Sequence, residues 1–95
     1  MVKFEQGNVL LKPSHRRQVM TWLKRSIRLG ERKGDFALTL SMRRVGRQYD
    51  IRALVNGTAG NFNCHARRQD WRNAMRDVTW SLNSRLHGRS LSGRR

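Results

Sequence analysis

The chain has 95 residues, of which 21 are lysine or arginine and six are aspartate or glutamate, giving a formal net charge of +15. A folded body with this excess of one sign attracts polyanions, and arginine, which supplies most of the cations, binds phosphate bidentately. The length allows one domain, the lone Cys64 excludes an internal disulfide, and the chain has no run of about 20 apolar residues that could span a membrane.

Residues 2–11 predict a weak first strand, in which apolar and polar residues alternate until a break at residues 7–8. A helix is expected to follow, with Pro13 at its start and Ser14 as its capping residue. Gly30 is the expected stop signal of this helix. Its predicted apolar stripe consists of Val19, Met20, Leu23 and Ile27.

After this helix the apolar period changes to two, which predicts strands with one buried face. The first such strand covers residues 36–43 and leads into a tight turn at 44–47. The second covers residues 48–55, and a hairpin loop at 56–60 connects it to a short strand at 61–67. The side chains expected to point inward are Phe36, Leu38, Leu40, Met42, Tyr49, Ile51, Ala53, Val55, Phe62, Cys64 and Ala66.

The opposite side of these strands is polar. It carries Thr39, Ser41, Arg43, Asp50, Arg52, Asn63 and His65. Modules that read single-stranded RNA on a sheet display aromatic residues there, and this face has none. The sequence therefore disfavours that class of RNA-binding module.

Residues 69–86 predict the last helix, and Asp70 stands where its charge stabilises the N-terminal end. Its expected stripe is Trp71, Ala74, Met75, Val78, Leu82 and Leu86. The remaining segment is rich in Gly, Ser and Arg, so we expect a domain over residues 1–88 and a disordered basic tail over 89–95.

The element order β-α-β-β-β-α predicts an α+β fold with a single four-stranded sheet. Each strand offers one apolar face, so both helices are expected to pack on the same face of the sheet. The first strand, its helix and the next strand should form a right-handed crossover, and the later strands an antiparallel meander.

Both helices carry cations on the side opposite their apolar stripes. The helical count places Arg17, Lys24, Arg25 and Arg28 there in the first helix, and Arg72, Arg76, Trp80 and Asn83 in the second. Residues 14–30 contain no acid, whereas an ordinary solvated helix face mixes both signs. We expect the two outer faces to form one surface for RNA, joined by Arg67 and Arg68 before the second helix.

Trp80 is large and apolar, yet the helical count leaves it exposed. It could stack on a base or sugar, carry an arginine on its face, or cover the C-terminal tail, and the sequence does not choose among these. Trp22 lies at the edge of the first stripe and is expected to be peripheral core.

The chain shows no catalytic or metal-binding pattern. His15, His65 and His87 fall on three different elements, Cys64 is expected inside, and no pair of ligands has zinc spacing. No glycine-rich phosphate loop is present. We therefore expect neither an enzyme nor a cofactor or metal.

Three segments carry a family pattern: FALTLSMRR, then QYDIRALVNGTAGNFNCHA with its glycine-containing hairpin, then QDWRNAMRDVTWSLNSRL, whose helix begins with Asp70 and Trp71. Together they resemble the ribosome hibernation-promoting factors. These proteins are also called ribosome-associated inhibitors, ribosomal subunit interface proteins or sigma-54 modulation proteins. The similarity covers residues 36–86, and the N-terminal part agrees in element order, although its first strand is less apolar than is usual in that family.

The resemblance implies a non-enzymatic, cytoplasmic regulator of translation that preserves idle ribosomes during stress. Its partner would be the small ribosomal subunit, whose RNA such proteins bind through basic helix faces where mRNA and tRNA would lie. The resemblance also adds Arg85 and Arg89 to the candidate RNA-binding residues. Long members pair two ribosomes through a second domain that this chain lacks, so we expect a monomer that acts on single ribosomes.

One alternative remains open at this point. The core of double-stranded RNA-binding modules has the order helix, strand, strand, strand, helix, which this chain shares after its first strand. Such a module, or an RNA-processing enzyme that uses His65 or His87, would also need a basic surface. The lysine cluster expected at the start of the second helix in that class is absent.

Overall fold

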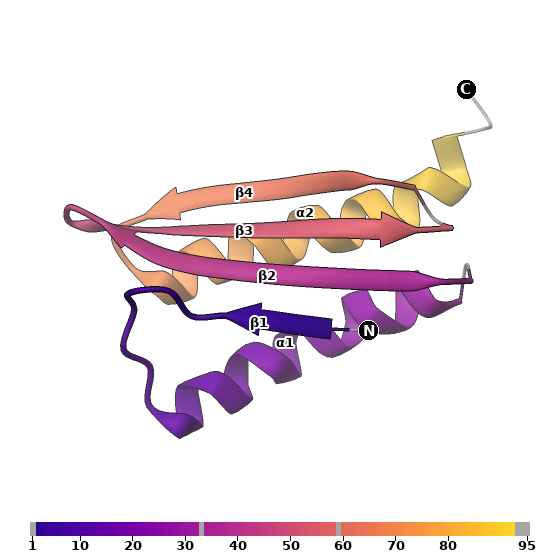
Figure 1. The fold of residues 1–95 in the computed structure, drawn as a ribbon. Coiled ribbons are helices and arrows are strands. Elements are labelled where there is room, and N and C mark those ends of the chain that lie inside the picture. Colours follow the sequence, from indigo (N-terminus) through magenta and orange to yellow (C-terminus); the bar gives the residue numbers. More distant parts are fainter. Residues whose placement is uncertain (1, 33, 59, 93–95) are drawn as a thin grey trace.

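The computed structural model describes residues 2–32, 34–58 and 60–92, and their side chains as far as Leu86. Within these ranges the chain forms four strands and two helices in the order β1, α1, β2, β3, β4, α2, which confirms the predicted α+β order (Figure 1). The strands are β1 Val2–Glu5, β2 Phe36–Val45, β3 Gln48–Gly57 and β4 Phe62–Arg68, and the helices are α1 Pro13–Glu31 and α2 Trp71–Ser92.

The strands form one sheet in the order β1-β2-β3-β4. β1 pairs in parallel with β2 across the α1 connection, and β2, β3 and β4 form the expected antiparallel meander. Figure 1 shows both helices on one side of this sheet and the other side uncovered. The β2–β3 turn is tighter than expected, because pairing extends to Val45 and Gln48 and leaves only residues 46–47 between the strands.

The core lies between the sheet and the two helices. The period-two pattern identified most of its strand residues, since Leu38, Leu40 and Met42 on β2 and Ile51, Ala53 and Val55 on β3 are almost fully buried. Tyr49 and Ala66, which were also expected inside, are only partly buried. All six predicted stripe residues of α2 are buried as well, and so is Cys64 on β4. Burial of this apolar surface is the main favourable term for folding.

The buried stripe of α1 differs from the predicted one. It consists of Val19, Leu23, Ser26 and Gly30, whereas Met20 is 37% exposed and Ile27 is only partly buried. The helix also continues to Glu31, so Gly30 is inside the last turn and is not the stop signal we expected. A Cβ atom at this position would collide with the ring of Phe36, so the missing side chain lets α1 approach β2 closely.

The helix ends were predicted with mixed success. Lys12 is the N-cap of α1 and Pro13 its first residue, so Ser14 does not cap the helix as expected. At the start of α2, Asp70 Oδ1 accepts a hydrogen bond from the backbone N–H of Arg72 at 3.1 Å, as its position suggested. The expected end of α2 at residue 86 is wrong, because the helix includes residues 89–92, and residues 93–95 lie outside the described part of the chain.

Candidate nucleic-acid interface

The outer faces of α1 and α2 carry exposed cations, as the helical count predicted. We call this the helix surface. It consists of Arg17, Lys24, Arg25 and Arg28 on α1 and Arg72, Arg76 and Trp80 on α2, all of which are exposed. These positions lie opposite the buried stripes, so packing of the helices on the sheet turns them toward solvent.

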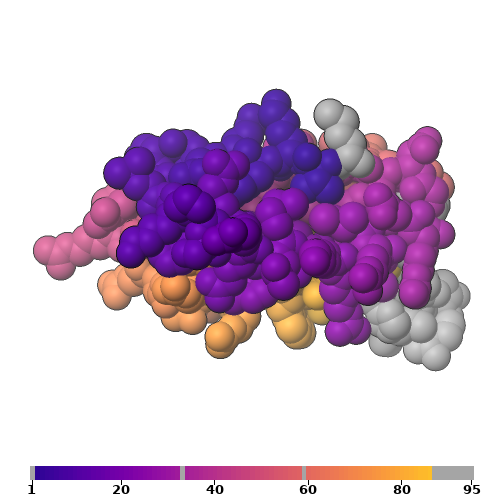
Figure 2. Space-filling view, turned by 90° about the horizontal axis from the view of Figure 1, so that it is seen from below, coloured from indigo at the N-terminus to yellow at the C-terminus, as the bar shows by residue number. Residues whose placement is uncertain are grey.

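The two helices lie side by side and run in the same direction (Figure 1), and in Figure 2 the surface of α2, in orange to yellow, adjoins that of α1, in purple. Near their N-terminal ends, Nε2 of His15 is 3.3 Å from a guanidinium nitrogen of Arg72, and further along the Ser26 hydroxyl donates to Asn83 Oδ1 at 2.6 Å. Both pairs are separated by 57 residues in sequence, so the helices keep a constant register. The ring of Trp71 packs between them, 5.2 Å from the ring of His15.

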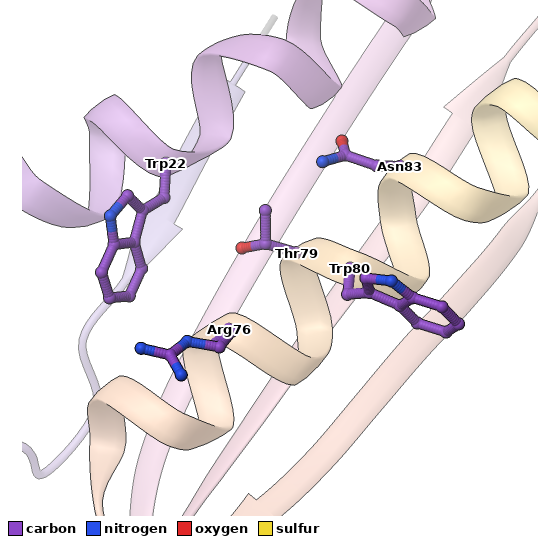
Figure 3. Close-up of a pocket in the computed structure, with 5 residues that line it drawn as sticks. All are labelled: Trp22, Arg76, Thr79, Trp80 and Asn83. Carbon is purple, nitrogen blue, oxygen red and sulfur yellow. The ribbon is translucent and has the colours of Figure 1, made fainter.

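A groove of about 370 Å³ lies on the helix surface between α1 and α2. It is lined by Trp22, Arg76, Thr79, Trp80 and Asn83, which Figure 3 shows on the facing sides of the helices and on the outer side of α2. Trp80 is 71% exposed, as predicted. Trp22 is partly buried against the core, also as predicted, and its ring centre is 6.3 Å from that of Trp71. Because Asn83 Oδ1 accepts from Ser26, the amide N–H groups of Asn83 are the donors left for a ligand.

A second hollow, of about 390 Å³, lies along α1 alone. Arg17 and Lys24, both predicted site residues, line it together with Arg16, Met20 and Thr21. Arg16 was not among the predicted residues, because the helical count places it near the buried side. Its guanidinium lies 5.5 Å from the centre of the Phe4 ring on β1, which keeps it at the edge of the helix surface.

Carboxylates do not neutralise the helix surface. Within the described residues, no ion pair joins an acid to any of its arginines or to Lys24. Asp77 on α2 is engaged by Arg68, whose Nε is 2.7 Å from Asp77 Oδ2, and Asp70 caps the helix. The surface therefore keeps its positive charge for an external polyanion.

Arg67 and Arg85, both predicted site residues, lie away from the helix surface. Arg67 is on the uncovered face of the sheet, where its guanidinium is 3.5 Å from Asp50 Oδ2. Arg85 lies beside the β4 edge, donating to the carbonyl of Asn63 at 2.9 Å and stacking 4.9 Å above the ring of Phe62. The side chain of Arg89 lies outside the described residues.

Asp50 was expected to point outward into solvent, and this expectation is only partly right. It is on the polar side of the sheet, as the strand period predicted, but its side chain is only 1% exposed. The pairing of three strands, which the sequence does not give, places cations around it.

The described side chains do not form a metal site, since they include no group of three or more potential ligands. Burial raises the pKa of the Cys64 thiol, and the nearby Arg85 lowers it by less, so this cysteine remains a neutral core residue. No helix in the described part of the chain is long and apolar enough to cross a membrane. What the helix surface offers is a fixed set of cations and one exposed aromatic ring.

No protein-family model matches the chain, and no curated protein matches its sequence. Several solved structures share its fold, and two of them each have a TM-score of 0.75. The N-terminal domain of Protein Y from Thermus thermophilus is 16% identical, and the match covers 90% of this chain and 93% of that one. A ribosomal subunit interface protein from Coxiella burnetii is 13% identical, with 95% and 97% covered. The structures that this chain resembles in fold thus match the hibernation-promoting factor family that its sequence resembles.

Proposed function

We propose that this chain is a ribosome-associated translation inhibitor that binds RNA of the small ribosomal subunit through the helix surface. The observation that supports this most is the set of unneutralised cations, including Arg25 and Arg76, on one side of a fold shared with a ribosomal subunit interface protein. A polyanion with a rigid, shaped backbone would complement such a surface.

The proposed mechanism is steric. Guanidinium groups of the helix surface would pair with phosphates, which fixes position and orientation without reading sequence. The bound domain would then occupy space that mRNA and tRNA need on the small subunit. No covalent bond is made or broken, so inhibition would be reversible and its strength would follow the occupancy of the site.

Trp80 would add a contact of a different kind. Its exposed ring is on the outer side of α2, where Figure 3 shows it directed away from Trp22 and Arg76, and it also lines a hollow of about 300 Å³ together with Arg85 and Asn63. Such a combination suits an unstacked nucleotide, whose base stacks on the indole while its phosphate pairs with the arginine. Of the roles that the sequence left open, base stacking is the one that the exposure of the ring supports best.

Charge reversal tests the proposal. We expect the double variant Arg25→Glu and Arg76→Glu to lose co-sedimentation with purified small subunits while its circular dichroism stays native, because both side chains are exposed. The matched control is Arg32→Glu with Arg47→Glu, which changes the net charge equally at two exposed positions outside the helix surface. If both variants co-sediment equally well, the helix surface is not the binding site.

Binding to a bare RNA duplex separates this function from a double-stranded RNA-binding module. A hibernation factor should bind small subunits far more tightly than a duplex of about 16 base pairs, the length that such modules span. Equal affinity for the two would favour the double-stranded RNA-binding module. The same assay reports any cleavage of the RNA, and the proposed function predicts none.

A further inference from the structure

The uncovered face of the sheet contains a buried carboxylate. Asp50 is on β3, on the side away from both helices, yet its side chain is 1% exposed. Since no helix covers that face, neighbouring side chains must shield the carboxylate from water. Buried charges are rare unless they are paired, so the identity of these neighbours is informative.

Four basic side chains surround Asp50. Three guanidinium groups approach its Oδ2 atom: Arg43 Nε at 3.7 Å and terminal nitrogens of Arg52 and Arg67 at 3.5 Å each. Nε2 of His65 lies 2.6 Å from Oδ1. We call these five residues the sheet cluster.

Strand register creates the sheet cluster. Arg43 on β2 and Arg67 on β4 are the direct cross-strand partners of Asp50. Arg52 is the next outward residue along β3, and it pairs directly with His65 on β4. Side chains on one face of adjacent strands lie about 5 Å apart, so the sheet itself holds these cations together.

The charges in the sheet cluster do not balance. One carboxylate faces three arginines, and the other acid on this face, Glu5, is engaged by Lys3 at 3.5 Å and Ser41 at 3.4 Å. Burial raises the pKa of Asp50, but His65, Arg52 and Arg67 lower it by more, so the carboxylate is ionised at neutral pH. Counting the arginines alone, three positive charges face one negative charge in the sheet cluster.

The three guanidinium groups also keep free donors. Their side chains are 61%, 58% and 42% exposed for Arg43, Arg52 and Arg67, and each guanidinium has five N–H groups. A hollow of about 520 Å³ is lined by Arg43 and Arg52 together with the acids Asp50 and Glu5. Asp50 thus holds three like charges close together that would otherwise repel each other, and leaves most of their donors facing solvent.

We propose that the sheet cluster is a second phosphate-binding site, which takes the phosphodiester backbone of an RNA segment other than the one on the helix surface. This rests on the proposed function, because that function makes RNA the polyanion. The exposed arginines match phosphate in charge and in bidentate geometry. Among the described residues this face carries no Phe, Tyr or Trp ring, so contact with the RNA backbone is its proposed mode of binding. The protein would then lie between two RNA segments.

The test is the salt dependence of binding to small subunits. Arg52→Gln with Arg67→Gln removes two charges from the sheet cluster and leaves Arg43 and His65 beside Asp50. If both arginines contact phosphate, the slope of log affinity against log salt should become shallower by about 2. The matched control, Arg32→Gln with Arg47→Gln, should keep the wild-type slope. A sheet-cluster variant that keeps the slope of the control overturns the proposal.

A second measurement uses the unaltered protein, so its result does not depend on whether the variant folds. Phenylglyoxal modifies accessible arginines, and mass spectrometry locates the modified ones. Arg43, Arg52 and Arg67 should be protected by small subunits and also by protein-free small-subunit RNA. Modification at the rate of the free protein contradicts the proposal. Protection by whole subunits alone would instead identify an acidic ribosomal protein as the partner and contradict the assignment to RNA.

The two proposals can fail separately. If charge reversal at Arg25 and Arg76 abolishes binding while the sheet-cluster variant behaves as its control, the function stands and the second site does not. If the unaltered protein does not bind small subunits, the proposed function fails first.

Discussion

At the scale of single residues, Trp80 combines a large apolar ring with a position that folding alone does not explain. It is 71% exposed beside the cations of the helix surface. Exposed tryptophans are costly for solubility, and they are frequent at sites that bind partners.

We predict that Trp80→Ala weakens binding to small subunits by roughly 5- to 150-fold, because stacking on one base is worth about 1–3 kcal/mol. Trp80→Phe should recover part of this loss, and neither change should alter the slope of affinity against salt, since no charge is removed. The melting temperature should stay close to that of the wild type. Unchanged affinity for the alanine variant would show that the ring does not contact RNA.

The pH dependence of stability tests whether the neighbouring cations stabilise the ionised carboxylate of Asp50. Its pKa is lowered from the ordinary value of 3.8 in the folded state, so the unfolded chain takes up the proton more readily. The ionised carboxylate therefore stabilises the fold above about pH 4, and this contribution disappears as the pH falls through the lowered value. We predict that the difference in unfolding free energy between wild type and Asp50→Asn shrinks as the pH is lowered from about 6 to 3.

Urea unfolding of the two proteins at each pH provides the measurement. The other carboxyl groups are common to both proteins, so their titration largely cancels in the difference. A difference that stays constant over this pH range would mean that the neighbouring cations do not stabilise the ionised form of Asp50.

At the scale of elements, the contact between α1 and β2 depends on the absence of a side chain at Gly30. Replacing a helical glycine by alanine normally stabilises a helix by about 1 kcal/mol. Here the added methyl group would collide with the buried ring of Phe36. We predict that Gly30→Ala lowers the unfolding free energy by about 1–2 kcal/mol, because overpacking outweighs helix propensity.

A double-mutant cycle checks the cause. In a Phe36→Leu background, where the ring is gone, the cost of Gly30→Ala should fall or change sign. Ser84→Ala, at an exposed position of α2, is the control for propensity alone. An equal cost of Gly30→Ala in both backgrounds would exclude the ring as its source.

Most of the fold was predictable because both helices and the three later strands have clear apolar periods. Local pattern does not say which residues of α1 meet another element. Ser26 is buried because Asn83, which is 57 residues away, accepts its hydrogen bond, and Gly30 is buried because of Phe36. Met20 is at the edge of the stripe, and the way in which α1 lies on the sheet leaves it partly in solvent.

The positions of the candidate site residues were also predictable only in part. Cations on the outer helix faces follow from the helical period, so Arg25 and Arg76 were placed correctly from sequence. Residues near the end of β4 depend on strand register and on the sheet edge, so the positions of Arg67 and Arg85 required the structure. The sheet cluster was missed because its five members converge from three strands.

At the scale of the whole molecule, positive charge lies on two opposite sides. The helix surface is on the side of the sheet that both helices cover, and the sheet cluster is on the uncovered side (Figure 1). A single RNA duplex would contact one side, whereas a crevice between RNA segments would contact both. The shape therefore favours a folded ribosomal RNA over an isolated helix as the partner.

The same charge predicts strong dependence on salt. If about six phosphates are neutralised, the affinity for small subunits should fall roughly a thousandfold or more between about 50 and 200 mM salt. Equilibrium binding at several salt concentrations measures this slope. A slope near zero would mean that apolar contacts dominate, and would contradict binding through the cations of the helix surface.

The most direct test is to fractionate a lysate of stationary-phase cells that contain the protein on a sucrose gradient. At low salt, we predict that the protein sediments with small subunits or with whole ribosomes, and that at about 0.5 M salt it moves to the top of the gradient. Recovery at the top of the gradient at low salt would contradict the account.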